Sequence, residues 1–304
     1  METRKIGSLD VSVVGLGCNN FGGRLDPERT AAVVHACLDA GVTFFDTADV
    51  YGGTKSEEYI GRALGNRRDE VVLATKFGGR IDDDRRGAKA DYVQRAVEDS
   101  LRRLNTDRID LYQLHVPDAE TPIEETLAAL DDLVRAGKVR EIGCSNFSVE
   151  QLRAADAGVR PGRARFRSVQ NEYSLLHRAP EEGVLAECER LGQGFLPYFP
   201  LASGLLTGKY RQGQPAPEGT RLANATSNRF LNDESLARAE ALIRFAEGRG
   251  RTILELAVSW LLARPVVASV IAGATSPAQV HANAAAARSQ LTAAEMAEVD
   301  AILA

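Results

Sequence analysis

Short apolar runs alternate along the chain with longer segments in which apolar residues recur every three or four positions. The short runs predict buried strands, and the longer segments predict amphipathic helices. A hairpin over residues 4–13, with Gly7-Ser8 as its turn, is predicted ahead of them. Eight strands are then predicted, over residues 13–17, 43–45, 71–75, 109–114, 141–144, 168–171, 194–198 and 269–271.

Several helical segments begin and end at recognisable residues. Asp26-Pro27 opens one helix and Gly41 closes it. Thr121 is the predicted N-cap of another helix, which Gly137 ends. Further signals are Pro122 and the capping-box residue Glu124 in that helix, capping-box starts at residues 148–151 and 276–279, and an apolar face formed by Val93, Val97, Leu101 and Leu104.

Eight strand-then-helix units in 304 residues predict a (β/α)8 barrel with an N-terminal hairpin and C-terminal helices. A doubly wound sheet is the alternative, but no GxGxxG motif follows the first strand, and Gly15-Leu16-Gly17 is only a fragment of one. No linker or low-complexity segment interrupts the pattern. We therefore expect one domain over residues 1–304.

Composition changes this picture little. Hydrophobic residues make up 44% of the chain and charged residues 26%, with a net charge of −5 spread over interspersed acids and bases. This balance argues against a nucleic-acid or membrane partner. The charged N-terminus and the absence of a long apolar run predict a cytoplasmic protein without a signal peptide. The cysteines Cys18, Cys37, Cys144 and Cys188 are spaced as free thiols, and no residues have metal-ligand spacing.

Four polar residues stand just beyond the predicted strands. Asp46 follows the second strand, with Tyr51 on the next loop, and Lys76 and His115 follow the third and fourth strands. Taken singly, each has an ordinary explanation: a capped turn, a packed tyrosine, a solvated lysine and a core histidine. In a parallel barrel, however, the carboxyl ends of all strands open onto one face, so these four side chains would converge there. The group suits proton donation by a phenol.

Loops are expected to shape that face. Residues 211–232, rich in Gly, Pro, Asn and Arg, are too long for a plain connection and predict a functional loop over the barrel mouth. Phe21 and residues 116–120 are also expected to shape the pocket. Arg221 and Arg229 either lie on the surface or favour an anionic substrate. The charged run at residues 82–87 predicts a solvated loop tip.

The chain resembles the aldo-keto reductase superfamily, and the resemblance extends over nearly its whole length. It is similar to the branch of bacterial oxidoreductases related to potassium-channel β subunits. The resemblance implies a (β/α)8 barrel that binds a nicotinamide cofactor without a Rossmann fold and reduces carbonyl groups by hydride transfer. The matching segments are residues 44–52, 74–76 and 110–115, which resemble catalytic segments, and residues 143–147, 169–173 and 200–210, which resemble cofactor segments.

The resemblance gives the four strand-end residues roles. Tyr51 would donate the proton to the developing alkoxide, and Lys76 would lower the phenol pKa from its ordinary value of about 10. Asp46 would hold Lys76, and His115 would hydrogen-bond the substrate oxygen.

The resemblance also implies a set of cofactor residues. Ser145, Asn146 and Gln170 would bind the nicotinamide carboxamide, Tyr198 would stack on its ring, and Phe199 departs from the usual small residue. NADP is favoured over NAD, although Gly273 and Gln279 stand where many members carry Lys and Arg. The remaining residues are Pro200, Leu201, Ala202, Ser203, Gly204 and Lys209 around the pyrophosphate, Thr275 and Asn283 at the adenosine end, and Gly17, Cys18 and Asn19 after the first strand.

The sequence thus predicts an NADPH-dependent oxidoreductase acting on a small-molecule carbonyl or alcohol. Two alternatives stay open. One is a cofactor-bound regulatory or redox-sensing subunit with slow turnover. The other is a sugar or cyclitol dehydrogenase on the same scaffold.

Overall fold

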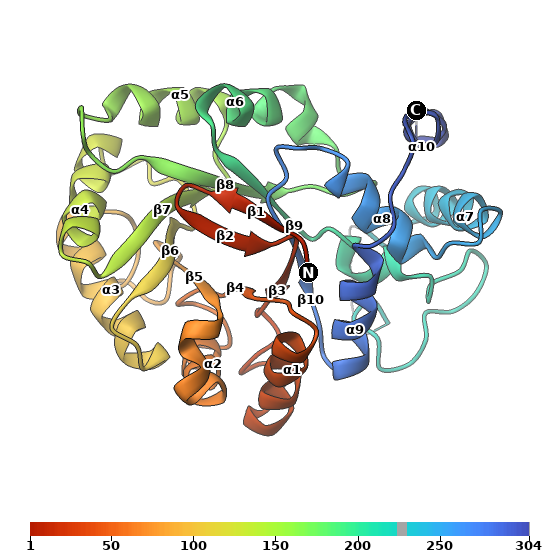
Figure 1. Cartoon of the computed structure of the whole chain (residues 1–304), viewed down its shortest axis with the longest axis horizontal. Helices are drawn as coiled ribbons and strands as arrows, with labels where there is room; N and C mark the ends of the chain where they lie inside the picture. Colours follow the sequence, from red (N-terminus) through yellow and green to blue (C-terminus); the bar gives the residue numbers. More distant parts are fainter. Residues whose placement is uncertain (224–229, 304) are drawn as a thin grey trace.

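A parallel eight-stranded sheet forms the centre of the computed structural model, which describes residues 1–223 and 230–303 (Figure 1). Neighbouring strands follow the order β10-β3-β4-β5-β6-β7-β8-β9. The barrel closes between its two outer strands, where β9 forms a parallel bridge from Phe195 to Val267, just before β10, and Phe195 N donates to Val266 O at 2.7 Å. The strands are β3 (Val14–Gly17), β4 (Phe44–Asp46), β5 (Val72–Phe77), β6 (Ile109–Leu114), β7 (Val139–Ser145), β8 (Phe166–Glu172), β9 (Gly194–Tyr198) and β10 (Val270–Gly273).

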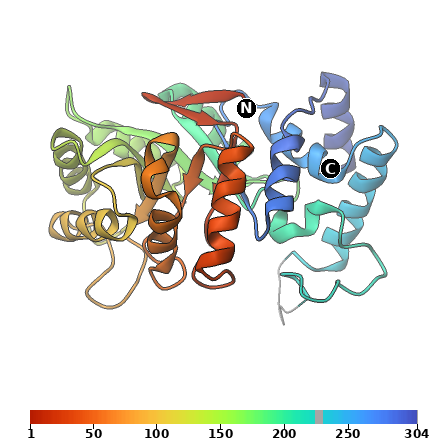
Figure 2. The ribbon, with the colours of Figure 1, turned by 60° about the horizontal axis from the view of Figure 1, so that its bottom comes forward.

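Helices surround this barrel, so the predicted (β/α)8 fold is confirmed. Figure 2 shows α1 and α9 packed side by side, which closes the helical ring where β10 meets β3. The ring helices are α1 (Pro27–Asp39), α2 (Lys55–Leu64), α3 (Ala90–Leu104), α4 (Ile123–Arg135), α5 (Val149–Gly158), α6 (Val184–Leu191), α8 (Ile253–Leu262) and α9 (Pro277–Ala286).

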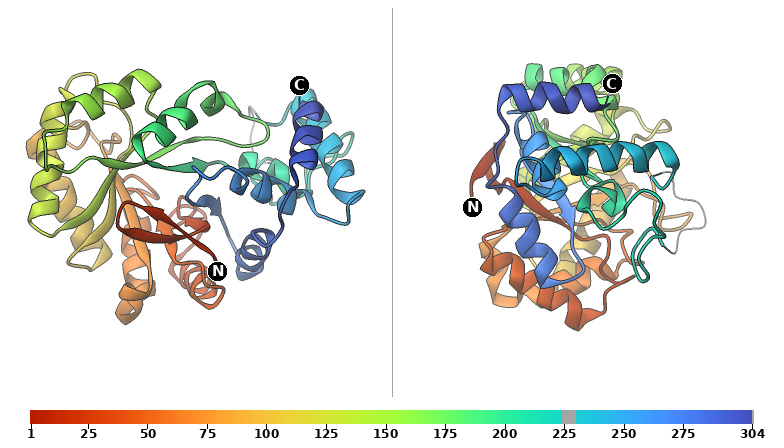
Figure 3. Two further views of the ribbon diagram at one scale, coloured as in Figure 1. Left: turned by 45° about the horizontal axis from the view of Figure 1, so that its top comes forward. Right: turned by 90° about the vertical axis from the view of Figure 1, so that its right-hand side faces the viewer.

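Two further helices lie outside the ring, α7 (Asp233–Glu247) and α10 (Ala293–Leu303), and they pack against each other (Figure 3). Short 3-10 helices are η1 (Gly65–Glu70), η2 (Ala179–Glu182) and η3 (Ala202–Thr207). No helix of the described ranges is long and apolar enough to span a bilayer.

The N-terminal hairpin closes one end of the barrel. Its strands, β1 (Thr3–Ile6) and β2 (Leu9–Ser12), pair antiparallel around the predicted Gly7-Ser8 turn and lie across the barrel in Figure 1. Ile6 and Leu9 are buried in a cluster with Phe44 and Leu111 from the barrel interior. This apolar plug leaves the opposite end, where the parallel strands terminate, as the open face.

Helix boundaries follow the sequence signals with one exception. Asp26 and Ser148 cap α1 and α5 as predicted, and the apolar face of α3 is buried. Thr121 was the wrong N-cap for α4, because Pro122 occupies that position without a side-chain cap. The Thr121 hydroxyl instead donates to Asp118 Oδ2 at 2.8 Å. A nearby carboxylate therefore competes successfully for the hydroxyl that would have capped the helix.

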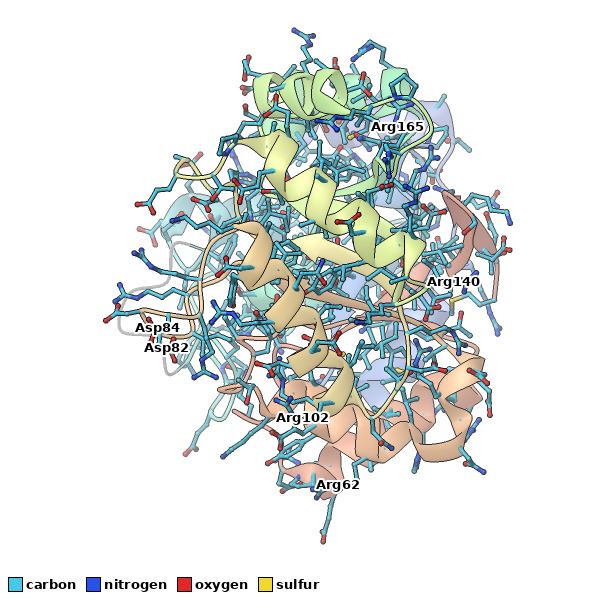
Figure 4. The ribbon with its side chains drawn as sticks, turned by 90° about the vertical axis from the view of Figure 1, so that its left-hand side faces the viewer. Arg62, Asp82, Asp84, Arg102, Arg140 and Arg165 are labelled. Carbon is cyan, nitrogen blue, oxygen red and sulfur yellow. The ribbon has the colours of Figure 1, made fainter. Side chains whose placement is uncertain are left out.

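The charged run at residues 82–87 lies on an exposed loop, where Asp82 and Asp84 project from the molecule (Figure 4). Arg85 donates to Asp82 Oδ2 at 2.7 Å within the loop itself. These local ion pairs at high exposure contribute little to stability.

Candidate active site

A cavity of about 720 Å³ opens at the carboxyl ends of the barrel strands. Residues at or just beyond the ends of β3, β4, β6, β7, β9 and β10, and Gln170 within β8, line it. The cavity thus lies on the face predicted from the parallel strand order.

A buried ion pair lies directly behind this cavity. Lys76 lies inside β5, one residue before its end, rather than beyond it, and is fully buried. Its Nζ donates to Asp46 Oδ2 at 2.6 Å and to the Thr47 carbonyl at 2.8 Å. Burial by itself lowers the pKa of Lys76, but Asp46 and Tyr51 more than offset this effect and raise the pKa above its ordinary value. The lysine is therefore held as an ammonium ion.

The other oxygen of Asp46 is held by neutral amides. Gln113 Nε2 donates to Asp46 Oδ1 at 3.0 Å, and Gln170 Nε2 donates to the same atom at 2.9 Å. The carboxylate therefore has partners on both oxygens although it is nearly inaccessible to solvent.

Tyr51 lies over this ion pair and borders the cavity. Lys76 Nζ is 5.2 Å from the centroid of its ring, and the His115 ring stands edge-on at 5.8 Å. Burial raises the pKa of Tyr51, and the Lys76 charge only partly opposes this rise. Lys76 therefore lowers the Tyr51 pKa as expected, but burial has the larger effect, and Tyr51 is a protonated phenol at neutral pH.

A glycine fixes the turn that carries Tyr51. Gly52 has a φ of +58°, and a Cβ at this position would lie 2.3 Å from the Phe21 carbonyl oxygen. Only glycine satisfies both the left-handed backbone and this close approach. The tyrosine loop is thereby held against the loop that follows β3.

His115 is a neutral imidazole at physiological pH. Burial, assisted by the Lys76 charge, lowers its pKa to about 3. Its Nδ1 is buried without a hydrogen-bond partner among the described residues. A neutral ring beside Tyr51 can donate one hydrogen bond to a ligand oxygen without bringing a second positive charge.

Amide and hydroxyl groups from three strand ends meet on another wall of the cavity. Asn146, at a φ of +63°, donates through Nδ2 to the His115 carbonyl at 3.0 Å and to Ser145 Oγ at 3.1 Å. The Tyr198 hydroxyl donates to Asn146 Oδ1 at 2.8 Å, and Ser145 Oγ donates to the Gln170 carbonyl at 2.7 Å. These bonds preset a group of donors and acceptors suited to a planar amide ligand.

The turn after β9 is conformationally strained. Phe199, Ala202 and Ser203 have φ values of 50°, 45° and 58°, a region that side-chain-bearing residues seldom adopt. The Phe199 ring stands edge-on to Tyr198 at 5.4 Å and to Phe230 at 6.1 Å. The aromatic residue that departs from the family's small one therefore packs the turn against the long loop.

Cationic groups line the far part of the cavity. Arg24, Lys209 and Arg221 border it, and the Arg221 guanidinium lies 5.9 Å from the Phe199 ring centroid. Burial and the neighbouring Arg24 charge lower the pKa of Arg221, and no carboxylate opposes them. Within the described part of the chain, none of the three cations forms an ion pair. This concentration of unpaired positive charge suits an anionic ligand.

The start of α9 completes the wall beyond these cations. Thr275, Gln279 and Asn283 line the cavity there. Ser276 caps the helix, but Gln279 Oε1 accepts a hydrogen bond from Thr275 N at 2.8 Å, so its side chain does not close the expected capping box with Ser276. The helix N-terminus adds a favourable potential for an anion.

The structure brings together nearly all the residues that the sequence singled out. All the predicted catalytic and cofactor residues line the cavity except Lys76 and Ala202. Ala202 is fully buried in the core, where the strained turn directs its side chain away from the cavity.

Of the loop residues predicted to shape the cavity, only some in the long loop line it. Phe21 is fully buried and residues 116–120 do not line the cavity, so the expectation that they shape it was wrong. Residues 219–221 of the long loop do line it, and Arg229 lies outside the described residues. Sequence reasoning missed Asn20, Arg24 and Thr207 as lining residues. The glycines just before Arg24 were the available signal that this loop approaches the cavity closely.

All four cysteines are free and buried, and Cys18 lies at the cavity wall. Burial raises the pKa of each thiol. Over residues 1–223 and 230–303, no three His, Cys, Asp or Glu side chains are grouped so as to hold a metal ion.

Comparison with known proteins finds relatives that agree with the resemblance to aldo-keto reductases. A model of the Aldo/keto reductase family matches residues 13–304. A probable voltage-gated potassium channel subunit beta from Oryza sativa subsp. japonica is 36% identical over 296 residues, which cover 93% of this chain and 90% of that protein. The aldo-keto reductase yakc [NADP(+)] from Schizosaccharomyces pombe is 37% identical over 280 residues, covering 87% and 80%.

A solved structure is similar over the whole fold. The glycerol dehydrogenase AKR11B4 from Gluconobacter oxydans superposes with a TM-score of 0.85 at 33% sequence identity. The match covers 99% of this chain and 95% of that one.

Proposed function

Because this chain belongs to the aldo/keto reductase family, we propose that it is an NADPH-dependent oxidoreductase that reduces an aldehyde or ketone to an alcohol with Tyr51 as proton donor. The family makes it an oxidoreductase of small-molecule carbonyl compounds that works with a nicotinamide cofactor. The observation that carries the finer proposal is the buried Lys76–Asp46 pair placed behind a cavity-lining tyrosine.

The cavity residues fit a nicotinamide dinucleotide. The unpaired cations Arg24, Lys209 and Arg221 suit its phosphates, and the amide wall suits a carboxamide. In this proposal Ser145, Asn146 and Gln170 bind the carboxamide, and Tyr198 stacks on the nicotinamide ring. The strained turn of residues 199–204 would hold the pyrophosphate, and Gln279 and Asn283 would hold the adenosine end. When bound, the cofactor supplies the hydride that reduces the carbonyl carbon.

The protein supplies the proton. A raised pKa keeps Tyr51 protonated at neutral pH, which is the form that reduction requires. As negative charge develops on the substrate oxygen, the phenolic proton passes to it and the charge moves to Tyr51. The buried Lys76 ammonium, 5.2 Å from the centroid of the Tyr51 ring, stabilises the resulting phenolate, and neutral His115 donates a hydrogen bond to the same substrate oxygen. Oxidation of an alcohol reverses these steps.

We propose NADP rather than NAD because three cationic side chains, Arg24, Lys209 and Arg221, line the cavity, one more than the two negative charges of a pyrophosphate. The relative from Schizosaccharomyces pombe, whose name includes NADP(+), favours the same choice. Gln279 and Gly273 are neutral, so the 2′-phosphate would depend on the α9 N-terminus and the nearby guanidinium groups.

Specific relatives favour two alternative functions. Similarity to a potassium channel subunit beta favours a regulatory protein that retains cofactor and turns over slowly. Similarity to a glycerol dehydrogenase favours oxidation of a polyol on the same scaffold. A fluorescence titration with NADPH and NADH, followed by turnover assays on aldehydes, ketones and polyols, separates the three.

The decisive variant is Tyr51→Phe. We expect it to bind NADPH as the wild type does and to lose roughly 10²–10⁴-fold in kcat, because the proton donor is gone while the ring remains. Tyr59→Phe on α2, which does not line the cavity, is the matched control and should retain activity. A near-wild-type rate in Tyr51→Phe would exclude the assigned role.

A further inference from the structure

Gln113 is a fully buried side chain in the middle of β6 to which the reaction gives no task. It lies in register with Lys76 on one side and Gly143 on the other. Gln113 and Lys76 are therefore neighbours on adjacent strands, and their side chains enter the barrel on the same side.

The Gln113 amide makes its bond to the ion pair rather than to the backbone. Its Nε2 donates to Asp46 Oδ1 at 3.0 Å, while its Oε1 accepts from Gln170 Nε2 at 3.4 Å. Gln170 Nε2 also donates to Asp46 Oδ1 at 2.9 Å. The three side chains form a closed triangle, although they come from β4, β6 and β8.

In this triangle the two oxygens of the Asp46 carboxylate have different partners. Oδ1 faces the two neutral amides, so Oδ2 faces Lys76 Nζ. A carboxylate held by only one amide could rotate about χ2, because the χ2 angles of aspartate are broadly distributed. Two donors from different strands remove that freedom and direct the charge towards the lysine.

The barrel makes room for this arrangement through a glycine. A Cβ on Gly143 would lie 2.2 Å from Ser168 Oγ and 3.2 Å from Gln113 Cγ. A side chain at this position of β7 would clash with Ser168 and press against the Gln113 side chain. Gly143 on β7 therefore leaves the space that the Gln113 side chain occupies.

We propose that Gln113 is a positioning residue for proton transfer: it orients the Asp46 carboxylate so that Lys76 stays fixed behind Tyr51. Through Gln170 it also couples this ion pair to the wall assigned to the nicotinamide carboxamide. The inference rests on the proposed function, because it assigns Gln113 a part in the same reaction.

A merely structural glutamine would affect stability alone. A positioning glutamine affects kcat more than the cofactor Kd, and it affects the pH dependence of the rate. If the Lys76 ammonium is less well fixed, it stabilises the Tyr51 phenolate less, and the alkaline limb of the reduction moves to higher pH.

The test compares Gln113→Met, which keeps the shape and removes both hydrogen bonds, with Gln193→Met. Gln193 is another buried glutamine, which donates to the Phe166 carbonyl at 3.0 Å away from the cavity. We expect Gln113→Met to lose roughly 10–100-fold in kcat, with the NADPH Kd within about threefold of wild type. Its alkaline limb should move up by roughly half a unit or more. Gln193→Met should share any loss of thermal stability but show neither kinetic change.

A second variant, Gln113→Glu, tests the same contact if Gln113→Met folds poorly. The carboxyl group that it introduces can donate to Asp46 when protonated but repels it when ionised. We expect its rate to fall steeply as pH rises through the titration of the new carboxyl. A rate that does not change with pH in Gln113→Glu would overturn the proposal. A wild-type kcat and an unshifted alkaline limb of the pH–rate profile in Gln113→Met would also overturn it.

A crystal structure of Gln113→Met gives a readout independent of turnover. The proposal expects the Asp46 carboxylate to rotate and its Oδ2 contact with Lys76 to lengthen; an unchanged ion pair contradicts it. If the wild-type protein reduces no carbonyl compound but the variant still disturbs the ion pair, the proposed function fails while the positioning contact stands.

Discussion

The two ends of the cavity are built on different principles. At the end near Tyr51, Lys76 and Asp46 satisfy each other at 2.6 Å and two amides complete the carboxylate. At the far end, Arg221 and Lys209 line the cavity without an acidic partner in the described part of the protein. The charges at the first end are paired within the protein, whereas the unpaired cations at the second end suit an anionic ligand.

The backbone shows the same contrast. The reacting end is carried by paired strand residues, while the far end includes the run of positive φ values at Phe199, Ala202 and Ser203. Strain of this kind persists where the surrounding structure fixes it, and it is common at ligand-binding sites. In the proposed function, the protein alone preorganises the reacting groups, whereas the bound cofactor would complete the turn and the loop.

The strongest test of the complete end is Lys76→Met. Removing the ammonium leaves Asp46 buried and uncompensated, and we expect a loss of about 3–5 kcal/mol in the free energy of unfolding. The alkaline limb of any remaining reduction should also move to higher pH, because the Lys76 charge no longer opposes the raised pKa of Tyr51. Urea unfolding and a pH–rate profile measure the two effects.

Lys138→Met is the matched control, because Lys138 forms an exposed ion pair with Glu98. It should cost no more than about 1 kcal/mol. Equal losses in the two variants would show that the Lys76 pair is not the preorganised element.

Asp49 is the exception at this end and gives the second test. It is buried, neither carboxylate oxygen has a hydrogen-bond partner in the described structure, and burial, with a contribution from Glu57, raises its pKa to about 7. The folded protein therefore binds a proton that the unfolded chain releases near pH 4, so stability falls as pH rises from about 4 to 7. The titratable groups that act on it or respond to it are Glu57, Lys76, Tyr92, Arg103 and Tyr112.

Asp49→Asn should remove this loss. We expect the variant to gain about 2–4 kcal/mol relative to wild type at pH 8, and the difference to vanish near pH 4. Chemical unfolding across this pH range measures it. A difference that does not change with pH would mean that Asp49 is ionised in the fold.

The far end provides the third and smallest test. Arg221→Gln removes an unpaired guanidinium from the cavity, and we expect NADPH affinity to fall about tenfold, with a weaker salt dependence. Arg211→Gln is the control in the same loop, since Arg211 is paired with Glu240 at 2.8 Å. If both variants bind NADPH equally, the unpaired cations do not hold its phosphates.

Much of this molecule could be predicted from local sequence. β6 and β9 have the predicted bounds, and the other strands differ only at their ends. The reason is that apolar runs, caps and turn glycines act over a few residues. Parallel strand order then places Asp46, Tyr51 and His115 on one face without further information.

Contacts between distant segments were not readable in the same way. Gln113 reads as one more residue of an apolar strand, and only the β5–β6–β7 register brings it to Asp46. Arg24 is an ordinary loop arginine until the long loop brings Arg221 beside it. Ala202 belongs to a matching motif, yet a left-handed turn buries it.

The sequence by itself determined the elements, their order and the face on which polar strand ends gather, because those depend on periodicity and local chemistry. Tertiary structure alone decided which side chains are paired, which are left unpaired and what their pKa values become. Those properties depend on distances across the barrel and on exclusion of water, which arise only when the strands close around a common core.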